Sequence, residues 1–240
     1  MKRTVLGCCL SIAVFGFAAR AGAQTPEEGP NVGDQGHWSL SIDRAFGFDY
    51  LQSKPQMNGV SEGTSSSTTF SLFGNPAAGS ASAFSFPRLA FDAFVGSGVS
   101  VGAGLGLFHL SQSLDETGTT LVGADESATG FIIAPRIGYV GRLNPLVAIW
   151  PRLGASVIYA STDITPTGGS QETVSLYAVA VTAEVPFVFT LAPHAAVTLG
   201  PTFDYSFAGK STLSQPGAGS ASTDEHLLEF GVQAGLVITL

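Results

Sequence analysis

Apolar residues alternate with small or polar residues at a period of two along eight segments of the chain. Residues 228–240 show this most clearly, with Phe230 and Leu236 at even positions and Glu229 and Gln233 at odd ones. Successive side chains of a β-strand point to opposite faces of the sheet, so each segment predicts a strand with one apolar face. The eight segments are 38–50, 88–95, 99–107, 131–139, 147–159, 177–189, 197–207 and 228–240.

The connections between these segments alternate in length, which predicts how the strands are arranged. Short turns at one end and long polar loops at the other are typical of a closed, antiparallel, up-and-down transmembrane β-barrel. The sequence therefore predicts an all-β fold with eight strands. Ten strands are the alternative, because residues 68–73 alternate weakly. The short turns are 96–98, 143–145 and 191–194, and the long loops are 52–84, 113–128, 163–172 and 209–224.

Composition supports a membrane barrel over a soluble domain or a bundle of membrane helices. Hydrophobic residues make up 45% of the chain and charged residues only 12%, against about 25% charged in ordinary soluble domains. After residue 23 there is no uninterrupted apolar run long enough for a membrane helix. The formal net charge of −8 argues against a nucleic-acid partner, since binding to phosphates needs basic side chains.

The first 23 residues are predicted to be an export signal. Lys2 and Arg3 precede an apolar stretch at 5–19, and the small residues 21–23 form a cleavage site. Removing Lys2, Arg3 and Arg20 leaves 7 basic and 18 acidic residues, a charge of 7 − 18 = −11. The predicted division is a signal peptide at 1–23, a short periplasmic tail at 24–36 and the barrel at 37–240. Cleavage before Cys8, as in a lipoprotein, is the alternative.

The only cysteines, Cys8 and Cys9, belong to this signal. The exported chain is therefore expected to have no disulfide and no cysteine metal site. The long loops are rich in carboxylates, and weak binding of a divalent cation there is an alternative to simple solvation. They contain no calcium-loop spacing, so neither a metal nor a cofactor is predicted.

Three stretches and the C-terminal strand carry a resemblance to a known family. They are residues 88–92, residues 100–105 and residues 134–139. From Trp38 to Leu240 the chain resembles the small outer-membrane β-barrels of Gram-negative bacteria, the broad eight-stranded family that includes the OmpA transmembrane domain and OmpX. The resemblance implies a location in the outer membrane and insertion by the barrel-assembly machinery, and it indicates almost nothing about activity.

The two faces of the predicted strands differ in chemistry. Aromatic residues gather near the ends of the apolar face, as in the girdles of membrane barrels, although a soluble sandwich with one apolar core is the alternative. The opposite face holds charges, which must pair because the interior of an eight-stranded barrel is only wide enough for side chains. A plugged lumen is therefore predicted, with a gated ion path as the alternative. The predicted lumen network is Asp43, Arg88, Asp92, Arg136, Arg152, Glu184, Asp204 and Glu229.

One pair of residues suggests an enzyme. His109 and Ser111 share the lipid-facing parity near the outer rim, which resembles the His-x-Ser arrangement of barrel lipid A deacylases, where histidine activates serine as the nucleophile. The resemblance would make Glu116 or Glu126 the group that orients the imidazole. This chain has Gln112 where that family has asparagine. A histidine at a lipid interface without a catalytic role is the commoner case.

The sequence thus predicts a monomeric, non-enzymatic outer-membrane barrel that stabilises the envelope or presents acidic loops as a binding surface. Its expected partners are outer-membrane lipids, lipopolysaccharide and the assembly machinery. The alternatives are a lipid A-modifying enzyme, a narrow channel and a soluble periplasmic protein that binds a small apolar ligand.

Overall fold

The computed structural model describes residues 31–57, 60–61, 63–73, 75–78, 84–113, 124–166, 171–215, 217 and 219–240. The predicted signal peptide at 1–23 and the tail up to residue 30 lie outside this part of the chain. No helix in the described ranges is long and apolar enough to cross a membrane.

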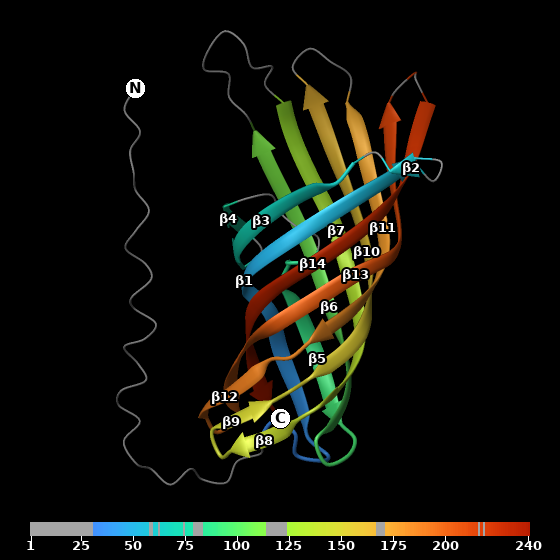
Figure 1. The fold of residues 1–240 in the computed structure, drawn as a ribbon. Coiled ribbons are helices and arrows are strands. Elements are labelled where there is room, and N and C mark those ends of the chain that lie inside the picture. The colour runs from blue at the N-terminus through green and yellow to red at the C-terminus, as the bar shows by residue number, and fades with distance from the viewer. Residues whose placement is uncertain are drawn as a thin grey trace.

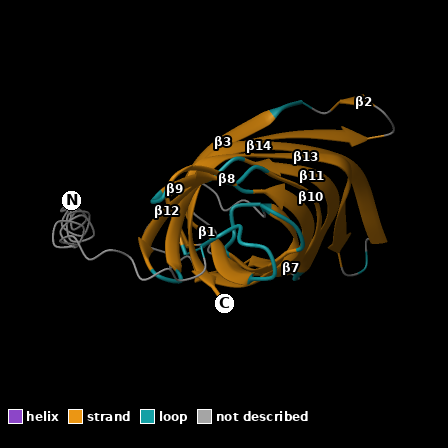
Figure 2. Ribbon diagram, turned by 90° about the horizontal axis from the view of Figure 1, so that it is seen from below, coloured by secondary structure: helices purple, strands orange, loops and turns teal. Residues whose placement is uncertain are grey.

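Eight antiparallel strands form a closed ring, which confirms the predicted fold class. Each strand pairs with the next along the chain, and β14 closes the ring by pairing with β1 over residues 39–56. Figure 1 shows the tall barrel from the side, and Figure 2 shows it from below. The ring consists of β1 (Trp38–Met57), β5 (Arg88–Phe94), β6 (Val99–Ser113), β7 (Ala124–Tyr139), β10 (Arg152–Pro166), β11 (Glu172–Glu184), β13 (Ala195–Gln215) and β14 (Gly219–Thr239).

Six shorter strands accompany the ring. Three follow β1 in the chain and extend the sheet beside its outer half: β2 (Val60–Ser61), β3 (Ser65–Leu72) and β4 (Asn75–Ala78). Three lie near the end with the short turns: β8 (Gly141–Asn144), β9 (Val147–Ile149) and β12 (Phe187–Ala192). The weakly alternating residues 68–73 belong largely to β3, which pairs with residues 46–53 of β1 and adds no strand to the ring. The ring therefore has eight strands rather than ten.

Strands extend into the predicted long loops. β13 continues to Gln215 and β14 begins at Gly219, so the hairpin predicted as a loop at 209–224 is paired over most of its length. Likewise, β10 continues to Pro166 and β11 begins at Glu172, so both strands enter the loop predicted at 163–172. Above the membrane both faces of a strand meet water, so the apolar alternation fades although the backbone pairing continues.

An apolar belt surrounds the outside of the barrel. On β7, Ile133 and Ile137 are 46% and 60% exposed, between Phe131 at one end and Tyr139 at the other. Eight residues separate the two aromatic side chains, roughly 26 Å along the strand or about 20 Å along the axis at a tilt near 40°. That height is close to the apolar band of about 25 Å in outer-membrane barrels. The belt and the closed ring place the protein in the outer membrane, and the soluble sandwich is wrong because these aromatic residues face outward.

Two apolar clusters fill the ends of the lumen. At the end with the short turns, Val32 from the N-terminal tail packs with Phe94, Val140 and Trp150. Backbone hydrogen bonds hold the tail across this end, from Gly36 to Phe94 and from Gly98 to Gly33. We call this the periplasmic end, because barrels of this type have their short turns there. Near the other end, the upper cluster contains Phe84, Phe86, Ile132, Ala134, Ile158, Ala178, Ala180 and Leu227.

Candidate functional site: the charged lumen

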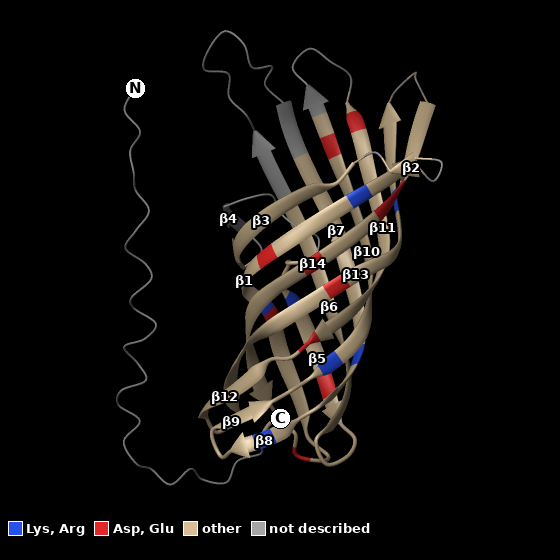
Figure 3. Cartoon of the chain, viewed as in Figure 1, with Lys and Arg blue, Asp and Glu red and all other residues tan. Residues whose placement is uncertain are grey.

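Between the two apolar clusters lies a network of buried ions. Its members come from inward positions of β1, β5, β7, β10, β11, β13 and β14. Figure 3 shows that charged residues occupy only a few positions along the strands of the barrel. Every residue that the sequence predicted for the lumen is buried or nearly so. Asp43, Arg88, Asp92, Arg152, Glu184, Asp204 and Glu229 are buried, and the Arg136 side chain is 8% exposed.

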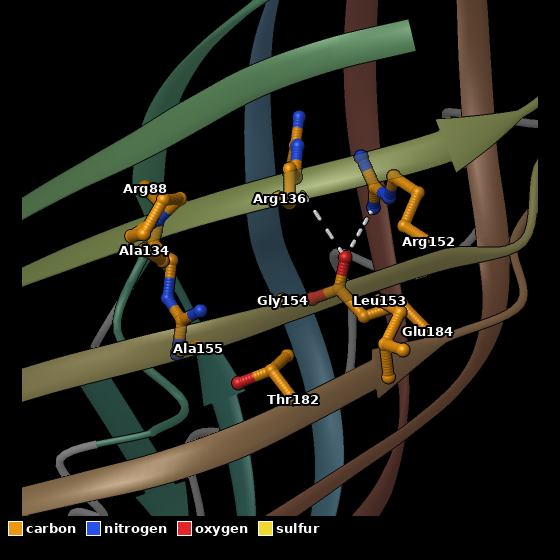
Figure 4. Close-up of a pocket in the computed structure, with 10 residues that line it drawn as sticks. Arg88, Ala134, Arg136, Arg152, Leu153, Gly154, Ala155, Thr182 and Glu184 are labelled. Atoms are coloured by element: carbon orange, nitrogen blue, oxygen red, sulfur yellow. Dashed lines mark ion pairs between the residues drawn. The ribbon is translucent and has the colours of Figure 1, made fainter. Parts of the chain in front are cut away.

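Glu184 contacts three arginines. Its Oε2 lies 2.7 Å from Nη2 of Arg152 and 4.0 Å from Nη1 of Arg136. Figure 4 shows these two ion pairs converging on one carboxylate. Its Oε1 accepts a hydrogen bond of 2.9 Å from Nη2 of Arg44. Removing one charge would therefore leave several guanidinium groups under-compensated, which is costly in a buried site.

Asp43 and Asp92 extend the network toward β5. Asp43 accepts hydrogen bonds from Nη1 of Arg152 at 3.2 Å and from Nη1 of Arg136. Asp92 accepts hydrogen bonds from the other side of the Arg136 guanidinium, from Nε of Arg136 at 3.0 Å and from its Nη2. Arg136 thus donates hydrogen bonds to two carboxylates, and the two-point contact with Asp92 fixes the plane of its guanidinium.

Arg44 is a network member that the sequence did not predict. It breaks the alternation of β1, because the strand bulges between Ile42 and Phe46 and Arg44 has a positive φ of 56°. The bulge turns the side chain into the lumen, where it pairs with Asp204 at 2.9 Å and with Glu184. A non-glycine residue in this conformation costs about 1–3 kcal/mol. The broken alternation at Arg44 was the only signal in the sequence.

Arg88 differs from the predicted pairing. It is buried, but no carboxylate oxygen in the described chain lies within ion-pair distance of it. Its Nη2 donates to the carbonyl of Phe84 at 3.2 Å, and its Nη1 lies 3.4 Å from Oγ of Ser156. Arg44 donates to the same Phe84 carbonyl at 2.6 Å. The two arginines therefore anchor the segment before β5 inside the lumen, a role that strand alternation does not reveal.

Trp150 closes the network toward the periplasmic end. Its ring lies 4.9 Å from the guanidinium carbon of Arg152 and 5.8 Å from that of Arg136, within cation–π range. Its Nε1 donates to Oγ of Ser100 at 3.1 Å, and the side chain is fully buried. Two voids of about 10 Å³ border the network, each with room for about one water molecule.

Of the predicted catalytic pair, only the His109 side chain lies in the described part of the structure. Nδ1 of His109 lies 2.9 Å from Oγ1 of Thr129, its register partner on β7. The side chains of Ser111 and Glu126, and the whole of Glu116, lie outside the described part of the structure. Within the described residues, no group of three or more potential ligands is arranged to hold a metal ion.

Comparisons with known proteins add similar folds at low sequence identity. No family model matches the chain, and no curated protein matches it. Among solved structures, OprG from Pseudomonas aeruginosa is 14% identical with a TM-score of 0.46, covering 87% of this chain and 99% of OprG. AlkL, solved in lipid bilayers, is 15% identical with a TM-score of 0.46, covering 91% and 97%. Ail of Yersinia pestis is 16% identical with a TM-score of 0.41, covering 85% and 100%.

Proposed function

We propose that the protein is a non-enzymatic outer-membrane barrel with a closed lumen, which stabilises the envelope or presents its outer end as a binding surface. The observation that supports this most is the ion network above Trp150. An eight-stranded barrel has little interior space, and here it is occupied by paired charges and an indole. A structure of this kind resists axial passage of ions or solutes.

Planar-bilayer recording tests the closed lumen. The intact protein is expected to show no single-channel steps in symmetric salt, under slow voltage ramps of either sign. Steps that vanish in a variant with an altered network would show that the network rearranges and would overturn the closed-lumen proposal in favour of a narrow channel. A heat-modifiability gel on the same sample checks that the inserted protein is folded.

The proposed surface role rests on the strands that rise above the belt. β13 and β14 have 21 residues each, about twice the 9–11 residues that a membrane-crossing strand needs. Their outer halves therefore lie in the aqueous layer beyond the membrane. We propose a monomer whose partners are the lipids and lipopolysaccharide around it and, during insertion, the barrel-assembly machinery.

A second function is favoured by the outer half of the lumen, which is apolar. The upper cluster lies next to a break in the wall. β6 pairs with β5 only up to Leu105, and β1 pairs beyond Arg44 with β3. No pairing joins β3 or β4 to the outer half of β6 among the described strands. We call this break the β3–β6 seam, and it would give an apolar molecule access to the upper cluster from the side.

Two phenylalanines of the chain itself occupy the space beside the β3–β6 seam. Phe86, just before β5, stacks on Phe108 of β6 with ring centroids 4.0 Å apart and an interplanar angle of 4°. Phe86 is 5% exposed. The second function is therefore binding of a small apolar molecule in place of the Phe86 ring.

Replacing Phe86 with Ala tests this function. Removal of a buried phenyl ring leaves an apolar cavity of roughly the size that binds benzene in other proteins. Binding of fluorobenzene, followed by fluorine NMR, is expected to be roughly tenfold tighter than in the intact protein, because the ligand no longer competes with the ring. Phe70→Ala is the control, since Phe70 lies exposed on β3. Equal binding by both variants would exclude the upper cluster as the site.

A further inference from the structure

Six outward-facing residues form one continuous row around the outer end of the barrel. Each is the direct register partner of the next, across β6, β7, β10, β11, β13 and β14. Five carry hydroxyl groups and the sixth is a histidine. We call this set the hydroxyl row: His109, Thr129, Ser161, Ser175, Thr212 and Ser222.

The hydroxyl row lies directly above the aromatic boundary of the belt. The boundary is formed by Phe131, Tyr159 and Tyr177, which are register partners across β7, β10 and β11. Each lies two residues along its strand from the member of the row on that strand. Two residues correspond to about 5 Å along the barrel axis at the usual strand tilt. Since aromatic girdles mark the membrane interface, the row lies in the first layer outside the hydrocarbon, where lipid headgroups are found.

The middle of the row has unused hydrogen-bonding capacity. At the two ends, His109 bonds to Thr129 and Thr212 bonds to Ser222 at 3.1 Å. Ser161 and Ser175, which face each other between these pairs, have no side-chain partner among the described residues and are half-buried. A hydroxyl group can both donate and accept. The small side chains of Ser161 and Ser175 lie two residues beyond the exposed Tyr159 and Tyr177.

The charge around the row argues against a phosphate ligand. Directly below it Lys210 lies opposite Asp224, and directly above it Asp163 accepts a hydrogen bond of 2.7 Å from Thr173. Phosphate recognition needs clustered arginine or lysine side chains, and one lysine beside two carboxylates does not provide this. The uncharged hydroxyl groups of a sugar match both the chemistry and the charge of the hydroxyl row.

We infer that the hydroxyl row binds the uncharged saccharide headgroup of an outer-leaflet glycolipid, with Ser161 and Ser175 as the central contacts. The inference rests on the proposed membrane orientation, which puts this end of the barrel in the outer leaflet. A second copy of the chain is a poorer occupant, because the row itself offers no apolar patch of the kind found at the core of protein interfaces.

Native mass spectrometry of protein purified from the host's outer membrane tests the inference. The probes are a monogalactosyl diacylglycerol, which has an uncharged sugar, and phosphatidylglycerol, which has a charged headgroup and no sugar. The intact protein is expected to retain the galactolipid in preference. Ser161→Ala/Ser175→Ala is expected to lower galactolipid affinity roughly tenfold, because two hydrogen bonds are lost.

Ser66→Ala/Thr68→Ala is the matched control. These two hydroxyl residues are exposed on β3, outside the row, and their loss is expected to leave galactolipid affinity unchanged. Equal retention of both lipids by the intact protein, or equal loss in both variants, would overturn the inference. A dimer that disappears in the Ser161→Ala/Ser175→Ala variant would instead identify a second copy as the occupant. A normal heat-modifiability shift in every sample separates failure of this inference from failure of the barrel proposal.

Discussion

Replacing Glu184 with Gln is expected to lower the free energy of unfolding by about 3–5 kcal/mol, as loss of one partner does in a buried ion pair. Glutamine keeps the size of the side chain but removes the charge that Arg44 and Arg152 contact at 2.9 and 2.7 Å. Equilibrium unfolding in urea, read from the heat-modifiability shift in lipid vesicles, measures the change. The midpoint is expected to fall by roughly 1–2 M.

Glu172→Gln is the control for this measurement. Glu172 lies at the other end of the same strand, where it accepts a hydrogen bond from Nε2 of Gln215 at the surface, and its replacement is expected to leave the midpoint unchanged. Arg152→Met is expected to have a smaller effect than Glu184→Gln. In that variant Glu184 still pairs with Arg44, and Asp43 still pairs with Arg136. Similar midpoints for Glu184→Gln and Glu172→Gln would show that water reaches the network and screens it.

The alternation of the sequence was enough to predict the barrel and the inward direction of the lumen residues. One face of each strand must meet lipid, so a charge such as Asp92 or Glu184 can only face the interior. Parity does not tell which charges pair. That depends on how the strands are staggered when the barrel closes, and this stagger brings Glu184 of β11 to Arg44 of β1 across the lumen.

Local departures from regular strands explain what the sequence did not predict. Arg44 has an even position in β1, like the lipid-facing Ile42 and Phe46, but a bulge turns it into the lumen. The segment that holds Phe84 and Phe86 turns into the lumen before β5 begins. Neither the bulge nor this inward turn leaves a periodic pattern in the sequence. The hydroxyl row was equally hidden, because its consecutive members are separated by 10 to 37 residues in the chain and become neighbours only through the register of the six strands.

Replacing Trp150 with Ala is expected to destabilise the barrel by about 3–5 kcal/mol, the usual cost of removing a large buried aromatic side chain. The indole packs with Phe94 at a centroid distance of 5.6 Å and lies beneath the guanidinium of Arg152. Its loss leaves a cavity between the ion network and the periplasmic cluster, and it leaves Oγ of Ser100 without its donor. The urea midpoint in vesicles again measures the effect.

The chain offers a matched control, because its other tryptophan faces lipid. Trp38 is 55% exposed and meets Phe91 edge-on at 5.3 Å, so Trp38→Ala removes an interfacial contact without opening a cavity and is expected to have a smaller effect. Trp150→Phe is expected to recover much of the lost stability, since it keeps an aromatic face for Arg152 and loses the bond to Ser100 and part of the buried volume. A midpoint for Trp150→Ala no lower than that for Trp38→Ala would mean that the wall collapses around the vacated space, and that Trp150 does not support the ion network above it.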